Sequence, residues 1–206
     1  SEIASHRDTF FQAMSFPNRP GLTPVSIVQA AAEAFEGAPR LAVDAGAHMF
    51  SAVAFWPASL PHDVLISNGL ATMAFALPAA VAAAMHDPER GAVAMTGDGG
   101  LMMCMGELVT AAQQNANLTV IVFNDGALSL IDIKRQEIQL PDLGFTWNRP
   151  DFATAAKGLG LDAWRVGSMD ELMSALVSAA DHKGASLIDV VLDPDGYLEQ
   201  MRALRG

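Results

Sequence analysis

Two short segments of the chain carry residue types that can hold a metal ion and a phosphate group. Gly97-Asp98-Gly99-Gly100 sets one carboxylate among three glycines, and Asn124-Asp125-Gly126 follows further along the chain. Carboxylate and amide oxygens suit Mg²⁺ or Ca²⁺, and the bare backbone N–H groups of a glycine-rich turn before a helix suit a phosphate. Together the two segments predict half of a site for a cofactor that carries a diphosphate and a metal ion.

Each segment also has a plainer interpretation. The glycine-rich segment alone fits a tight turn from strand to helix in which Asp98 caps the helix, and Asn-Asp-Gly is a common turn sequence. Their places in the chain favour the site, because Asp98 follows a predicted strand at 91–96 and Asn124 follows the next one at 118–123. Consecutive parallel strands are neighbours in most sheets, so the acid and the amide are expected to lie close together.

The elements around these segments alternate between strand and helix. Short β-branched runs predict strands at 40–44, 63–67, 91–96, 118–123, 162–166 and 186–192. Alanine-rich or amphipathic stretches predict helices at 25–36, after the turn at 45–48, and at 70–85, 101–114, 127–136, 151–160 and 170–182. The pattern predicts a doubly wound α/β fold, with a mostly parallel six-stranded sheet and helices on both faces.

This fold divides the chain into three parts. Residues 23–193 are predicted to form the cofactor-binding domain. Residues 1–22 are expected to be a linker or the end of a preceding region, with at most one short helix, and residues 194–206 a polar C-terminal tail.

Composition excludes several classes of function. The net charge of −11 provides no basic patch for nucleic acid. The longest apolar run, at 70–85, is broken by Pro78 and is shorter than the ~20 residues of a membrane helix, so it predicts a buried helix instead. The single Cys104 excludes an internal disulfide and fits a reducing cytoplasm, where we expect the protein.

Four motifs in the same order resemble one known family. These motifs are Asp44-Ala45-Gly46-Ala47-His48, the segment from Ser67 to Ala80 (SNGLATMAFALPAA), the pair of segments at 97–100 and 124–126, and Pro150-Asp151-Phe152. They resemble the C-terminal diphosphate-binding domain of thiamine-diphosphate enzymes of the acetolactate-synthase-like and 2-oxo-acid decarboxylase superfamily. The resemblance extends over almost all of residues 22–192.

The resemblance implies a role for individual residues. The Asp98 and Asn124 side chains and the Gly126 carbonyl would hold Mg²⁺, while Met73 would prop the cofactor in its bent shape. The implied cofactor-binding set is Gly46, Ala47, His48, Leu70, Thr72, Met73, Gly97, Asp98, Gly99, Gly100, Asn124, Gly126, Ala127 and Leu128. The residue types alone also allow a helix-cap role for His48 and a plain core position for Met73.

The family also implies a function. The domain would bind thiamine diphosphate and Mg²⁺ within a lyase or transferase that decarboxylates or carboligates a small 2-oxo acid. No residue of this chain is assigned to catalysis, because the glutamate that activates the cofactor lies on a pyrimidine-binding domain or subunit. This chain alone is therefore expected to be inactive, and it is expected to assemble as a homodimer or homotetramer.

Two rival functions remain at this point. A dinucleotide-binding dehydrogenase domain would need a G-x-G-x-x-G turn with an acid about 20 residues on, and the sequence has no such turn. A non-catalytic binding or assembly domain of the same fold stays open, because Gly100 stands where the family often has Ser and Ala127 where it often has a larger residue.

Overall fold

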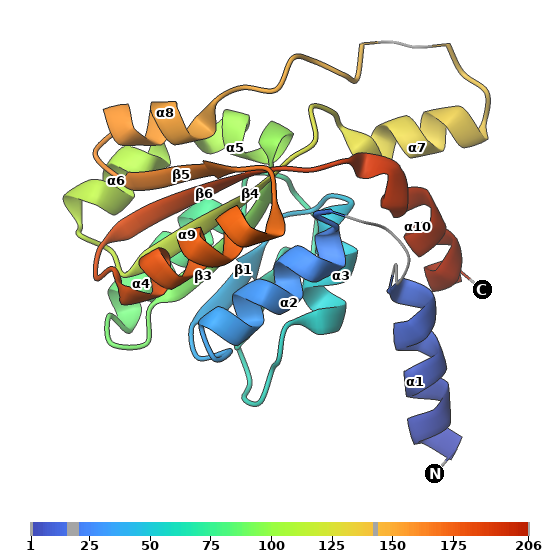
Figure 1. Ribbon diagram of the computed structural model, residues 1–206, viewed down its shortest axis with the longest axis horizontal. Coiled ribbons are helices and arrows are strands. Elements are labelled where there is room, and N and C mark those ends of the chain that lie inside the picture. Colours follow the sequence, from blue (N-terminus) through green and yellow to red (C-terminus); the bar gives the residue numbers. More distant parts are fainter. Residues whose placement is uncertain (1, 16–20, 142–143, 206) are drawn as a thin grey trace.

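The fold is that of a computed structural model, which describes residues 2–15, 21–141 and 144–205. A six-stranded sheet runs through its centre, and every strand is parallel to its neighbours (Figure 1). The strand order is β2-β1-β3-β4-β6-β5. The strands are β1 (Arg40–Val43), β2 (Val64–Ile66), β3 (Ala92–Gly97), β4 (Leu118–Asn124), β5 (Asp162–Val166) and β6 (Ala185–Val191).

Helices cover both faces of the sheet, so each strand contributes alternate residues to two separate cores. On one face, Val93, Ile121 and Ile188 pack against α2 (Pro24–Ala34), α3 (His48–Phe55) and α9 (Met169–Asp181). On the other face, Ala94 and Val120 pack against α4 (Ala76–His86), α5 (Asp98–Cys104), α6 (Glu107–Gln113) and α8 (Phe152–Gly158). The predicted doubly wound α/β class is confirmed.

Three further helices lie beside this layered body. α1 (Glu2–Met14) and α10 (Tyr197–Arg205) contact each other, and α7 (Ser129–Glu137) lies next to α10 (Figure 1). The short helix expected within 1–22 is thus present, although residues 16–20 of that segment lie outside the described part of the chain. Among the described residues, no helix is both long and apolar enough to cross a bilayer.

The prediction of a helix over 70–85 is wrong for residues 70–75. α4 begins only at Ala76, and Leu70, which was expected to be buried, is 88% exposed. The physical reason is local: Ala71 and Ala74 have positive φ angles of 48° and 61°, which a helix does not allow. The Asp44 carboxylate accepts the N–H groups of Ala74, Phe75 and Ala76 and so fixes the start of α4.

Two other predicted segments also differ. The prediction of a turn over 97–100 is wrong, because α5 begins at Asp98 and includes both following glycines. The single helix expected at 101–114 is instead divided into α5 and α6 near Gly106. The polar tail expected at 194–206 contains a 3-10 turn (η1, Pro194–Gly196) and α10. That helix buries three residues, Tyr197, Gln200 and Met201. The segment is short and mostly polar, so its sequence does not indicate a buried face.

The fold brings three strand ends together. The chain passes from β1 outward to β2 and then returns to β3 on the other side of β1, so the strand order reverses between β1 and β3. Ligands bind at such a reversal, outside the carboxyl ends of the strands. Asp44 follows β1, Asp98 follows β3, and Asn124 ends β4, all at this edge.

Candidate metal and diphosphate site

A partly open cavity of about 210 Å³ lies at this edge of the sheet. Residues after β1, at the start of α5 and after β4 line it, together with Met73 and with Tyr197 from α10. Ten of the predicted cofactor-binding residues are among its lining, namely Gly46, Ala47, His48, Met73, Gly97, Asp98, Gly99, Gly100, Ala127 and Leu128. The strand order therefore brings most of the predicted cofactor-binding residues together around this cavity.

Asp98 is buried at the first position of α5, with its side chain held by three donors. Its Oδ1 accepts the Gly99 N–H (2.8 Å), while Oδ2 accepts the Gly126 N–H (2.8 Å) and the Trp147 indole N–H (3.2 Å). A carboxylate offers about four acceptor positions, so Oδ1 keeps one for a further ligand. Burial raises the pKa of Asp98, whereas these three hydrogen bonds act in the opposite direction. A bound cation would compensate this buried charge.

Asn124 is fully buried at the end of β4, and only one side of its amide is paired. Its Nδ2 donates to the Pro150 carbonyl (2.9 Å) and to Oδ1 of Asp189 (2.7 Å). Its Oδ1 is buried and accepts no hydrogen bond. A buried oxygen without a partner is costly, and an amide oxygen is a suitable ligand for Mg²⁺. The orphaned oxygen therefore fits the metal that the sequence predicts.

Gly126 completes the predicted metal set. Its N–H binds Asp98, which places the turn after β4 directly beside the start of α5, and its carbonyl accepts the Trp147 backbone N–H at 2.8 Å. A carbonyl oxygen has a second acceptor position. The φ of Gly126 is +79°, and a Cβ there would lie 2.9 Å from the Trp147 carbonyl oxygen, so only glycine fits. Among the described residues, no three acidic, His or Cys side chains cluster as metal ligands, so this mixed oxygen set is the candidate.

The glycines of α5 allow other groups to approach closely. A Cβ on Gly100 would collide with the Asp44 carboxylate, and one on Gly99 would lie 2.8 Å from Leu128 and 3.3 Å from the Met73 methyl group. The Gly99 N–H is already bound to Asp98. Its donation to a diphosphate stays a prediction, as does that of Gly100.

His48 is buried at the start of α3, and its ring stacks on Phe123 with centroids 5.1 Å apart. Its Nε2 has no partner. Burial lowers the pKa of His48 to about 4, although the nearby Asp44 charge acts in the opposite direction. The imidazole is therefore neutral at pH 7 and carries a single N–H, so it would meet an anion as a hydrogen-bond donor only in the tautomer protonated at Nε2, and not as a cation.

Met73 lies in a backbone segment held from both sides. The positive-φ residues Ala71 and Ala74 flank it, and Asp44 binds the N–H groups that follow it. L-amino acids adopt such φ values at a cost, so the Asp44 contacts hold a strained segment against the cavity. Met73 is among the residues that line the cavity, and its role in holding the cofactor in its bent shape stays a prediction.

Four predicted residues are not among the cavity lining. Asn124 and Gly126 alternate along the chain with the lining residues Phe123, Asp125 and Ala127, and the Gly126 N–H binds Asp98 of the lining. Leu70 points into solvent, and the Thr72 hydroxyl binds Ser67 while its carbonyl accepts the Ala45 N–H. The cofactor roles of Leu70 and Thr72 stay predictions that this arrangement does not support.

Sequence reasoning missed five residues that shape the site, namely Asp44 as an anchor, Asp125, Trp147, Asp189 and Tyr197. Asp125 binds Ser129 Oγ (2.6 Å) and the Ala127 N–H, and burial raises its pKa to about 7. Asp189 gave a signal in the sequence, because an acid inside the apolar strand 186–192 requires a buried partner. Trp147 and Tyr197 reach the site from distant segments and gave no local signal.

The parallel sheet, the cavity at its carboxyl edge and the candidate oxygen ligands are features of a cofactor-binding domain of the doubly wound α/β class. The model of the family "Thiamine pyrophosphate enzyme, C-terminal TPP binding domain" matches residues 44–190. The chain belongs to this family. Its cofactor is thiamine diphosphate, with Mg²⁺ as the usual partner in the family.

Curated relatives agree with this assignment. The chain is 29% identical over 177 residues to acetolactate synthase isozyme 1 large subunit of Escherichia coli K12, covering 84% of this chain and 31% of that protein. It is 30% identical over 176 residues to the catabolic acetolactate synthase of Raoultella terrigena, covering 85% and 32%. The chain thus spans about a third of the length of these relatives.

A solved structure shares the fold. Benzoylformate decarboxylase from Polynucleobacter necessarius superposes with a TM-score of 0.74 at 21% identity, over 82% of this chain and 33% of that one. The predicted family, cofactor and fold class are confirmed.

Proposed function

We propose that this chain binds the Mg²⁺-diphosphate end of thiamine diphosphate within an enzyme that decarboxylates or carboligates a 2-oxo acid. The observation that carries the proposal is the buried, unpartnered Oδ1 of Asn124, two residues before Gly126, whose N–H binds Asp98. Asp98, Asn124 and the Gly126 carbonyl would hold the metal. His48 would donate a hydrogen bond to the diphosphate, and Met73 would pack on the cofactor.

The chemistry of the reaction belongs to the cofactor. Thiamine diphosphate, when bound, supplies a nucleophilic carbon and an electron sink. The residues of this chain would bind and orient the cofactor, and the apolar walls formed by Met73, Leu128 and Phe123 would limit the access of water to it. A lyase or transferase acting on a 2-oxo acid is the reaction class that the acetolactate synthase and decarboxylase names of the similar proteins suggest.

The partner in this proposal is a pyrimidine-binding domain or subunit that carries the activating glutamate. We assign no catalytic residue to the described chain, so turnover would require that partner and a homo-oligomeric assembly. The prediction of a cytoplasmic location rests on the single Cys104 and stays a prediction.

Calorimetry of the assembled protein with thiamine diphosphate and Mg²⁺ tests this function. Asp98→Ala is expected to weaken Mg²⁺-dependent cofactor binding by at least 10-fold, since one charged ligand is lost. Asp170→Ala, at an exposed acid of α9, serves as the matched control and is expected to change nothing. Unchanged affinity in Asp98→Ala would remove the metal assignment, and cofactor binding without turnover of any 2-oxo acid would favour the non-catalytic alternative.

A further inference from the structure

We infer that Asp189 is a positioning residue that fixes which end of the Asn124 amide faces the metal. The inference rests on the proposed metal site, and it concerns a residue outside the predicted set. An amide ligand works only in one orientation, because its oxygen binds a cation and its NH₂ group repels one. Metal binding by Asn124 therefore requires a residue that fixes the orientation of its amide.

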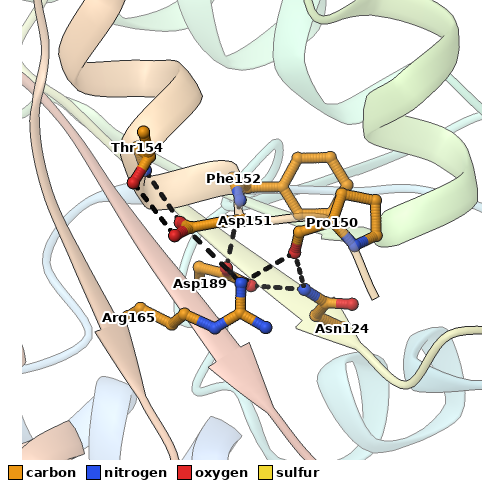
Figure 2. Close-up of polar contacts among 7 residues, drawn as sticks. All are labelled: Asn124, Pro150, Asp151, Phe152, Thr154, Arg165 and Asp189. Atoms are coloured by element: carbon orange, nitrogen blue, oxygen red, sulfur yellow. Dashed lines mark hydrogen bonds and ion pairs between the residues drawn. The ribbon is translucent and has the colours of Figure 1, made fainter. Parts of the chain in front are cut away.

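The sheet register brings the two side chains together. Asp189 of β6 pairs with Val122 of β4 and with Arg165 of β5. Side chains two residues apart on a strand share a face, so Asn124, Asp189 and Arg165 all project from the face that α8 covers (Figure 2). Asp189 has no solvent exposure.

Both oxygens of Asp189 are occupied by donors. Oδ1 accepts Asn124 Nδ2 at 2.7 Å, whereas Oδ2 accepts the Phe152 N–H at 3.1 Å and lies 3.4 Å from Arg165 Nη1. Arg165 also donates to the Pro150 carbonyl, which in turn accepts the second Nδ2 hydrogen of Asn124 (Figure 2). The carboxylate is thus held by fixed donors on one side and presents a pure acceptor to the amide on the other.

This arrangement allows one amide orientation. With Asn124 turned over, its Oδ1 would face the Asp189 carboxylate and the Pro150 carbonyl, and three acceptors would meet without a hydrogen. In the observed orientation both Nδ2 hydrogens are used and Oδ1 is left over, buried and unpartnered. Partners of this kind, which bind the far side of a metal ligand, typically change metal affinity 10- to 100-fold when they are lost.

Asp189→Asn is the variant that isolates this role, because it keeps the shape of the side chain. Its amide would turn its oxygen toward Arg165 and the Phe152 N–H and its NH₂ group toward Asn124. Asn124 would then turn over and present its own NH₂ group to the cation. We expect Mg²⁺ affinity of the assembled protein, measured by calorimetry, to fall by about 10- to 100-fold.

Asp63→Asn is the matched control. Asp63 is also buried, pairs with an arginine (Arg90, 2.6 Å) and accepts backbone N–H groups, but it lies at the opposite end of the sheet, at the start of β2. Its loss is expected to lower the melting temperature without changing Mg²⁺ affinity. Equal effects of the two variants on Mg²⁺ affinity would show that Asp189 acts only through stability and would overturn the inference.

A second substitution gives a rescue test. A carboxylate at 124 presents an oxygen whichever way it turns, so Asn124→Asp combined with Asp189→Asn is expected to bind Mg²⁺ more tightly than Asp189→Asn alone. No recovery in the double variant contradicts the inference. Asn124→Ala distinguishes a failure of the metal site from a failure of the positioning role. If this variant leaves Mg²⁺ affinity unchanged, the proposed metal site itself is wrong. If it weakens binding while Asp189→Asn does not, the positioning role alone fails.

Discussion

Trp147 binds Asp98 and Gly126 at once: its indole N–H donates to Asp98 Oδ2 at 3.2 Å and its backbone N–H donates to the Gly126 carbonyl at 2.8 Å. One residue of the loop before α8 thereby spans two of the three proposed metal ligands. Oδ2 of Asp98 is saturated by this contact and by the Gly126 N–H, which leaves Oδ1 as the oxygen with a free acceptor position. Asp98 and Asn124 thus share a pattern, in which the protein binds one side of each group and leaves the other open.

Trp147→Phe is expected to weaken Mg²⁺ binding about 10-fold, the lower end of the effect of such supporting contacts. The phenyl ring keeps most of the packing, but it removes the donor that holds Oδ2, so the carboxylate gains freedom to rotate. Titration calorimetry measures the effect, and Trp164→Phe in β5 is the control, expected to have no effect. Tighter binding in Trp147→Phe would show instead that the indole competes with the metal.

His48→Phe is expected to reduce the affinity for thiamine diphosphate by about 10-fold or more, since hydrogen bonds to charged groups contribute about 1.5–3 kcal/mol. Phenylalanine keeps the stack on Phe123 and removes the unpartnered Nε2. His86→Phe, at the exposed end of α4, serves as the control for a general effect of the substitution. Equal cofactor affinity in both variants would remove His48 from the diphosphate site.

Ala74→Gly is expected to stabilise the protein without cofactor by about 0.5–1 kcal/mol. The left-handed φ of +61° costs an L-residue roughly 1–2 kcal/mol, and glycine avoids this cost while losing some entropy on folding. Ala82→Gly, at an exposed position inside α4, is expected to lose about 1 kcal/mol from the same substitution. Urea unfolding midpoints compare the two, and a loss of stability in both would contradict strain at residue 74.

Acid is expected to remove the stabilising contribution of Asp63. The Arg90 hydrogen bond, followed by the Leu60 N–H, lowers the pKa of Asp63 from 3.8 to about 2. A folded-state pKa below the unfolded value means that the contribution is complete above about pH 4 and is lost as the pH falls toward 2. The difference in melting temperature between wild type and Asp63→Asn should therefore shrink over this range, whereas a constant difference from pH 7 to pH 2 would show that the carboxylate charge does not matter.

The sequence was informative where local chemistry decides the structure. Apolar β-branched runs predicted all six strands to within one or two residues, and Thr23, Asp151 and Ser168 cap the helices that they were expected to begin. Asp98 and Asn124 could be paired because consecutive parallel strands lie side by side.

Long-range contacts determine the features of the structure that local sequence patterns did not predict. The start of α4 depends on the Asp44 carboxylate, about 30 residues earlier, which no pattern within 70–85 reveals. The Trp147–Asp98 contact joins residues 49 positions apart, and the Asn124–Asp189 contact joins residues 65 positions apart. The proposed metal ligands could be selected from strand ends, but the residues that contact them lie on other strands and loops and become visible only in the folded chain.

The position of β4 in the sheet bears on how a ligand enters and leaves. β4 lies between β3 and β6, and all of its residues are buried, whereas residues 144–149, which carry Trp147, are exposed or half-buried. Segments with exposed backbone open locally at much lower free energy than central strands, which exchange their amide hydrogens only when the whole domain unfolds. We therefore expect Asn124 and Asp98 to keep their places during a local opening of residues 144–149. The dissociation rate of a cofactor bound at this site is accordingly expected to follow the local opening of this loop, and a mutation that slows only global unfolding is expected to leave that rate unchanged.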